Sequence, residues 1–237
     1  MNNQIIDNGF ILHRYPYRET SVILECFLQH HGRISIIAKG VRTERSPLKG
    51  LLQPFTPLHF NACGKSQLKT LTLAETVGSP ILLKGVPLMS AWYMNELLMR
   101  LLPKEEHNSH LYFTYHATLL ALENANALEK SLRIFEKNLL EALGYELPLT
   151  HDANSRHAII YDHYYQFVPE HGFIQAEKKE GVDIFIGEDL QAIANDQFAN
   201  PKALQAAKRL MRLAIRPLLG GKPLKTRELL SNMSIKK

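Results

Sequence analysis

Between residues 9 and 77 the chain alternates hydrophobic and polar positions in short runs, and turn residues separate the runs. Ile34 and Ile36, for example, alternate with Arg33 and Ser35. Successive side chains of a strand point to opposite faces, so a period of two is typical of strands. The pattern predicts five of them, over residues 9–13, 21–28, 33–39, 55–61 and 68–76. Short strands this close together indicate a small barrel or sandwich.

After residue 80 the hydrophobic positions recur at helical spacing. We expect helices over residues 88–102, 111–122 and 128–143, and Pro103 ends the first of them. In the third helix, large apolar residues three or four positions apart predict one buried stripe, which consists of Leu128, Leu132, Phe135, Leu139 and Leu143. Gly144 is placed to cap the C-terminus of this helix.

A further helix is predicted to begin at Pro201, because Asn200 is a preferred N-cap and proline is favoured at the first helical position. Pro217 and the following glycines, Gly220 and Gly221, end it. Its predicted buried stripe consists of Leu204, Ala207, Met211, Ala214 and Leu218.

Residues 148–187 have no clear hydrophobic period and contain scattered Pro, Gly and His, so we expect a small irregular insert that includes a β-hairpin. The sequence therefore predicts an α+β fold with two domains. A β-barrel occupies residues 1–80, and a helical domain occupies residues 81–237 with the insert at about 148–187.

The net charge of +5 is distributed unevenly along the chain. Residues 1–80 hold nine Lys or Arg against five Asp or Glu, residues 81–201 hold nine against seventeen, and residues 202–237 hold ten against one. Two basic ends flank an acidic middle, which favours contact with a polyanion such as nucleic acid or a membrane surface. Neutralisation of the middle by the ends is the other interpretation. The narrow apolar stripe of the last predicted helix disfavours the membrane.

Two basic segments are candidates for phosphate contacts. The first follows the third predicted strand and contains Arg33, Lys39, Arg42, Arg45 and Lys49, although a charged loop is often only solvated. The second covers the last predicted helix and the residues after it, with Lys208, Arg212, Arg216, Lys222, Lys225 and Arg227. For stacking on bases, Tyr15 and Tyr17 are candidates, beside Arg14 and Arg18 in the expected loop between the first two strands.

The sequence contains no signature of catalysis, neither a nucleophile elbow nor the spacing of a metalloprotease or a P-loop. Cys26 and Cys63 form no metal-binding pair, which favours a reducing cytosol. Successive histidines of the insert stand six to eight positions apart, whereas the ligands of structural zinc sites stand closer together in pairs. We therefore expect no metal or other cofactor. A hydrolase that uses these histidines with a metal is the alternative. These are His151, His157, His163 and His171. With no signal peptide and no long apolar run, we expect a soluble cytoplasmic protein.

Several segments together resemble the RecO family of bacterial recombination-repair proteins. They are GFILHRYPYRETSVILECF, GRISIIAKGVR, SPLKGLLQPFTPL, YMNELLMRLLP, FEKNLLEALGY and AAKRLMRLAIRPLLGGKPLKTREL. The resemblance implies an N-terminal OB-fold followed by a helical domain, and a nucleoid-associated protein without catalytic activity. It also implies binding to single- and double-stranded DNA, annealing of complementary strands, and binding to the acidic C-terminal tail of the single-stranded DNA-binding protein. RecR is an implied partner in RecA loading, with RecF and, indirectly, RecA as further ones.

The resemblance also guides the expectations for single residues. Many family members carry a four-cysteine zinc module, but residues 151–173 contain no cysteine, so zinc is not carried over. The two basic segments, with Arg14 and Arg18, are expected to form the DNA surface. Arg133 stands beside the apolar stripe of the third helix and is the candidate for the basic rim of a tail-binding groove, with an ordinary ion pair to Glu129 as the competing interpretation. A general OB-fold nucleic-acid-binding protein without mediator activity is the alternative function.

Overall fold

A computed structural model describes residues 4–124, 127–178 and 181–234, with side chains described through residue 229 of the last helix. The chain forms two compact units. The barrel unit consists of residues 1–123 and 224–237, and the second unit consists of residues 124–223. Helices that follow residue 80 therefore pack in the same unit as the barrel. The domain boundary at residue 80 stays a prediction.

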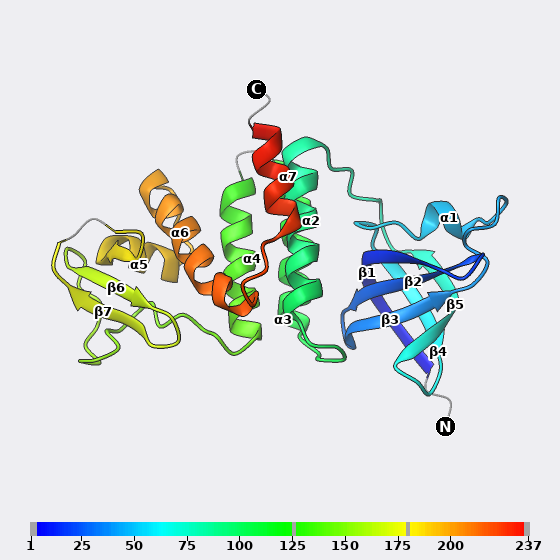
Figure 1. Ribbon diagram of the computed structural model, residues 1–237, viewed down its shortest axis with the longest axis horizontal. Coiled ribbons are helices and arrows are strands. Elements are labelled where there is room, and N and C mark those ends of the chain that lie inside the picture. Colours follow the sequence, from blue (N-terminus) through cyan, green and yellow to red (C-terminus); the bar gives the residue numbers. More distant parts are fainter. Residues whose placement is uncertain (1–3, 125–126, 179–180, 235–237) are drawn as a thin grey trace. The chain divides into compact units, whose positions relative to one another are not determined.

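Five strands form a closed barrel in the order β1-β2-β3-β5-β4, which Figure 1 shows in blue to cyan. The strands β3 and β5 pair in parallel and the other neighbours pair antiparallel, which is the arrangement of an OB-fold. The predicted α+β class and N-terminal barrel are confirmed. The elements are β1 (Gln4–Tyr17), β2 (Ser21–Leu28), β3 (Gly32–Ala38), a short helix α1 (Leu48–Leu51), β4 (Leu58–Cys63) and β5 (Leu68–Thr76).

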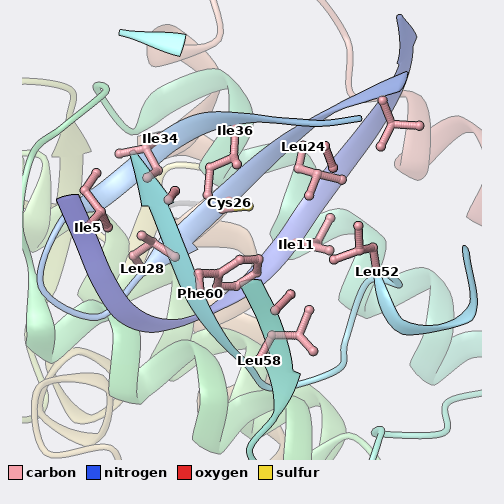
Figure 2. Close-up of a cluster of buried hydrophobic side chains, with 14 of the residues drawn as sticks. Ile5, Ile11, Leu24, Cys26, Leu28, Ile34, Ile36, Leu52, Leu58 and Phe60 are labelled. Carbon is pink, nitrogen blue, oxygen red and sulfur yellow. The ribbon is translucent and has the colours of Figure 1, made fainter. Parts of the chain in front are cut away.

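Apolar side chains fill the barrel, and Figure 2 shows them converging from its strands. Ile34 and Ile36 point inward, as the alternation along β3 predicts. Cys26 lies fully buried among them, where burial raises the pKa of its thiol well above the usual value and keeps it protonated. Cys26 is therefore a core residue of the barrel.

Two helices cover part of the outer face of the barrel, α2 (Gly85–Leu101) and α3 (Ser109–Ala121). Phe10 and Phe27 of the barrel meet Tyr112 and Tyr115 of α3, with ring centroids 5.4–6.0 Å apart. Burial raises the pKa of Tyr115, so its hydroxyl stays protonated and donates to the Asn95 side chain on α2. These contacts join the helices to β1 and β2 within one hydrophobic layer.

The helix α7 (Lys225–Ser234) begins at a carboxylate supplied by α2. Glu96 accepts hydrogen bonds from the backbone N–H groups of Lys225 and Thr226 and from the Thr226 hydroxyl. Desolvation alone would raise the pKa of Glu96, but these hydrogen bonds outweigh it and lower the pKa. The carboxylate acts as the missing N-cap and stabilises the first turn of α7.

Gly32 is the position where the barrel depends most clearly on a glycine. Its φ is +64°, and an added Cβ would overlap the carbonyl group of Glu106. We expect Gly32→Ala to lower the free energy of unfolding by about 2–4 kcal/mol, from the left-handed backbone and the clash together. Gly40→Ala is the matched control, because its φ is +70° with no atom within 4 Å of the new Cβ. Denaturation followed by Trp92 fluorescence measures the free energy of unfolding of both variants. Equal decreases in the two variants would contradict the contribution of the clash with Glu106.

In the described part of the second unit, three helices pack with a small sheet of order β7-β6-β8. The hairpin that the sequence predicts in the insert is confirmed as β6 and β7, whereas β8 and α5 were not predicted. The short β8 gains its hydrogen bonds only by pairing with β6, which local sequence does not reveal. The elements are α4 (Leu128–Ala142), β6 (Tyr164–Val168), β7 (Gly172–Ala176), β8 (Ile184–Ile186), α5 (Gly187–Ala194) and α6 (Pro201–Leu218).

Caps confirm the predicted end of α4 and the predicted start of α6, whereas Pro217 lies inside α6 and does not end it. Gly144 donates to the Glu141 carbonyl and Tyr145 donates to the Leu140 carbonyl, a Schellman arrangement at the end of α4. The Asn200 side chain accepts from the backbone N–H of Lys202 at the start of α6.

The predicted buried stripe of α6 was partly wrong. Ala207 and Met211 are buried, but Leu204, Ala214 and Leu218 are only partly so. Two helices, α4 and α5, pack against α6, and the face of α6 that they bury is not centred on the predicted stripe. Its small residues allow close approach between helices. The buried residues are Ala203, Ala206, Ala207, Leu210, Met211 and Ile215.

A buried carboxylate organises the segment between α4 and β6. Asp152 accepts hydrogen bonds from the backbone N–H groups of Asn154, Ser155 and Gln175 and from the Ser155 hydroxyl. Desolvation alone would raise the pKa of Asp152, but these hydrogen bonds lower it. In the described ranges, no group of three or more His, Cys, Asp or Glu side chains is placed to hold a metal ion.

Candidate nucleic-acid interface

The outer face of β1, β2 and β3 has a covered half and an exposed half. Cross-strand partners point to the same face of a sheet, so the strand register orders these side chains in rows. One row is Phe10, Phe27 and Arg33; α3 covers the two phenylalanines, and the segment after α2 covers Arg33. Another row is Tyr15, Ile23 and Ile37, of which Tyr15 is 43% exposed. Ile23 and Ile37 are partly buried, so this row forms a partly exposed platform on the barrel.

An ion-pair network occupies the boundary of the covered half. Arg33 pairs with Glu25 at 3.2 Å, and its Nε donates to the Leu102 carbonyl at 2.9 Å. The Lys104 ammonium donates to the Ser35 hydroxyl and lies 3.5 Å from the Glu25 carboxylate. The Arg33 side chain is only 13% exposed. Arg33, which the sequence places on the DNA surface, therefore stabilises the contact between the barrel and the segment after α2.

The platform carries aromatic rings on the strand itself. Tyr15 and Tyr17 belong to β1, and the prediction that they lie in a loop was wrong. Pairing of β1 with β2 continues to Tyr17 opposite Ser21, so the connecting turn is short. The Tyr15 ring lies 4.4 Å from the ring of His13, and the Arg18 guanidinium lies 5.2 Å from the centre of the Tyr17 ring. Flat side chains are thereby presented beside a cation.

Two loops bring exposed cations to the edge of the platform. The Arg42 guanidinium donates to the Arg18 carbonyl at 2.9 Å, which ties the loop after β3 to the turn between β1 and β2. A shallow hollow lies at this junction, and Arg18, Lys39 and Ile37 contribute to its lining. Arg45 is exposed further along the same loop, and Lys49 is exposed on the short helix α1 that follows. We call Arg18, Lys39, Arg42, Arg45 and Lys49 the basic rim.

Arg14 lies outside the basic rim. It pairs in register with Leu24 of the barrel core and is half-buried. This burial lowers the pKa of its guanidinium, which nevertheless remains charged at neutral pH. Its predicted role in DNA binding stays a prediction.

The predicted C-terminal cations are distributed over both units. In the second unit, Lys208 pairs with Glu129 at 2.8 Å, and Arg212, Arg216 and Lys222 are exposed. In the barrel unit, Lys225 and Arg227 are exposed at the start of α7. Their contact with DNA stays a prediction.

Arg133 is buried in the structure, with 5% of the residue exposed. Its guanidinium pairs with Glu136 at 2.9 Å, and Glu129 pairs with Lys208. Residues three apart share a helix face, which explains the choice of Glu136. The sequence suggests that Arg133 lies on the rim of a groove. In the structure it lies buried beside Glu136.

The residues that sequence reasoning missed are Ile23 and Ile37. Both read as ordinary strand positions, and only the register shows that they join Tyr15 on the exposed half. A closed five-stranded barrel of this strand order, with a partly exposed aromatic and apolar row and a basic rim, defines an OB-fold protein.

Family models identify the chain more closely. "Recombination protein O N terminal" matches residues 1–80, and "Recombination protein O C terminal" matches residues 85–228. The chain belongs to the RecO family of DNA repair proteins.

Curated relatives agree with this assignment. A DNA repair protein RecO from Coxiella burnetii is 44% identical over 225 residues, which cover 95% of this chain and 97% of the relative. A protein of the same name from Aliivibrio fischeri is 43% identical over 220 residues, with 93% and 92% covered. Another, from Haemophilus influenzae, is 42% identical over 224 residues, with 94% of each chain covered. Within the part of the chain that the structure describes, no helix has the length and apolar character to cross a membrane.

Proposed function

We propose that this RecO-family protein binds single- and double-stranded DNA through the platform and the basic rim, and that it anneals complementary strands. The observation that carries the proposal is the partly exposed row of Tyr15, Ile23 and Ile37 beside the exposed cations Arg18 and Lys39. Unpaired bases stack on such a surface whatever their identity, and cations hold the phosphates. The combination favours DNA binding without sequence preference.

Annealing on this surface needs no bond to be made or broken in the backbone of the DNA. The basic rim neutralises phosphates of one strand and thereby lowers its repulsion toward the second strand. Bases that stack on the platform through their ring faces use no hydrogen-bonding group of their pairing edges. These edges therefore remain available to a complementary strand. We therefore assign no catalytic residue, and the role that we propose for this protein is that of a mediator and not of an enzyme.

The proposed partners are RecR and the single-stranded DNA-binding protein, with RecA loading as the outcome. Membership of the RecO family supports this part of the proposal. For the acidic tail of the single-stranded DNA-binding protein, Arg133 remains the proposed contact. Because Arg133 is buried and paired with Glu136, this contact requires its guanidinium to leave the pair and become accessible to the carboxylate of the tail.

Tyr15→Ala tests the stacking part of the proposal. We expect about tenfold weaker binding to a single-stranded oligonucleotide, because one stacked base contributes about 1–3 kcal/mol. Binding to duplex DNA should change less than about twofold, since duplex bases already stack on one another. Fluorescence anisotropy with labelled single and double strands measures both. Tyr161→Ala, at an exposed tyrosine of the second unit, is the control. Equal losses for the two DNA forms, or none, would refute the role of Tyr15.

A further inference from the structure

A groove of about 520 Å³ lies in the second unit, where α4 and α6 end beside the β6–β7 hairpin. Leu140 of α4, Leu218 of α6 and Phe167 of β6 contribute apolar walls, and Leu147 also lines the groove. This volume is in the usual range for pockets that accept a compact ligand or an anchoring side chain. All the lining residues belong to one unit, and none belongs to the platform or the basic rim.

The carboxylates that line this groove are its only charged lining side chains among the described residues, apart from a histidine. Glu146 and Glu170 line it and are exposed, and no Lys or Arg is among the described lining residues. The remaining titratable lining groups are His171, whose ring is hydrogen-bonded to Asn154, and Tyr145. Two helices also end here, and the C-terminus of a helix carries partial negative charge. The groove therefore attracts cations and repels DNA or an acidic peptide.

The rim also carries an exposed aromatic ring. Tyr145 is 46% exposed, immediately after the cap of α4 and next to Glu146. An aromatic face next to carboxylates is a favourable site for the cationic end of Lys or Arg. Buried aliphatic anchors with a charged neighbour are a common way for one protein to hold a peptide segment of another.

We propose that this groove docks a segment of a partner protein that places an apolar side chain between α4, α6 and the hairpin and a Lys or Arg against Tyr145, Glu146 and Glu170. The apolar walls supply the anchor, and the carboxylates select a basic segment over an acidic one. None of its lining residues belongs to the platform or the basic rim of the barrel, so different residues test the two proposals. Failure of either proposal leaves the other standing.

Fluorescence anisotropy with two labelled, amidated peptides tests the proposal on the full chain. The basic probe is Lys-Leu-Trp-Lys-Leu-Lys, and the acidic probe of the same apolar pattern is Glu-Leu-Trp-Glu-Leu-Glu. We expect saturable binding of the basic probe that is at least about tenfold tighter than that of the acidic probe. Glu146→Gln plus Glu170→Gln should weaken the basic probe about tenfold, and Tyr145→Ala about fivefold.

The control removes the same charge outside the groove. Asp162→Asn plus Glu177→Gln changes two exposed carboxylates of the second unit that do not line the groove, and should alter affinity less than about twofold. An equal effect of both double variants would show general attraction to an acidic surface and overturn the proposal. Absence of saturable binding, or tighter binding of the acidic probe, would also overturn it.

Discussion

The double variant Arg42→Glu plus Lys49→Glu is expected to bind single-stranded DNA about a hundredfold more weakly than the unmodified protein at low salt. Both side chains are exposed on the basic rim, and each reversal replaces an attraction to phosphate with a repulsion. Loss of two phosphate contacts should also reduce the slope of log affinity against log salt by about 1.4, at 0.7 per contact with a single strand. Titrations at several salt concentrations measure both quantities.

Arg42 also has a structural contact, the hydrogen bond to the Arg18 carbonyl. Lys39→Glu plus Lys49→Glu leaves this bond in place and should reproduce most of the loss. Lys130→Glu plus Lys178→Glu makes the same change in net charge at exposed lysines of the second unit, and affinity should fall far less. An unchanged affinity and salt slope in both rim variants would show that DNA does not bind at the basic rim.

Asp7→Asn is expected to lower the free energy of unfolding of the barrel unit by about 2–4 kcal/mol at pH 7. The Asp7 carboxylate is buried and accepts hydrogen bonds from the backbone N–H groups of Asn8 and His30 and from the Nδ1 atoms of His30 and His31. An amide has only one acceptor oxygen and presents donors to the imidazoles. Trp92 packs against Phe55 in the barrel unit, so its fluorescence reports the loss.

The effect of Asp7 should depend on pH with a definite sign. Desolvation alone would raise the pKa of Asp7, but the hydrogen bonds from His31 and His30 outweigh it and lower the pKa below 3.8. A carboxylate with a lowered folded pKa stabilises the fold above its unfolded pKa, and this contribution is lost as pH falls through the folded value. The difference between the unmodified protein and Asp7→Asn should therefore shrink below about pH 4.

An exposed carboxylate of the same unit provides the comparison. Glu75 lies exposed on β5, and Glu75→Gln should change the free energy of unfolding by less than about 0.5 kcal/mol at any pH. If the deficit of Asp7→Asn were the same at pH 3 and pH 7, the charged carboxylate would not be its source.

Local patterns predicted the bounds of β2 and β5 correctly, because the strand pattern of each extends over its whole length. The predicted β1 was far too short. The observed strand extends from Gln4 to Tyr17, and its ends pair with β4 and β2 across polar and proline positions that carry no local strand signal. Long-range pairing sets its length. That length moves Tyr15 from an expected loop onto the platform.

The candidate site shows a similar division between local and tertiary information. Composition identified the basic segment after β3, and Lys39, Arg42, Arg45 and Lys49 are exposed there as expected. Arg33 has the same alternation as a solvent-facing strand residue, but the segment after α2 covers it and Glu25 neutralises it. The period of a sequence distinguishes the two faces of a strand. It does not show which part of the outer face another segment of the chain covers. The same limit applies to Arg133 on α4.

Annealing of complementary oligonucleotides coated with the single-stranded DNA-binding protein tests the proposed function most directly. The unmodified protein and Arg42→Glu plus Lys49→Glu should be compared at low and at higher salt. We predict that the unmodified protein accelerates annealing, that higher salt reduces the acceleration, and that the rim variant loses most of it at low salt. No acceleration by the unmodified protein, or the same acceleration by both proteins, would contradict the assignment of strand annealing to the barrel's basic rim.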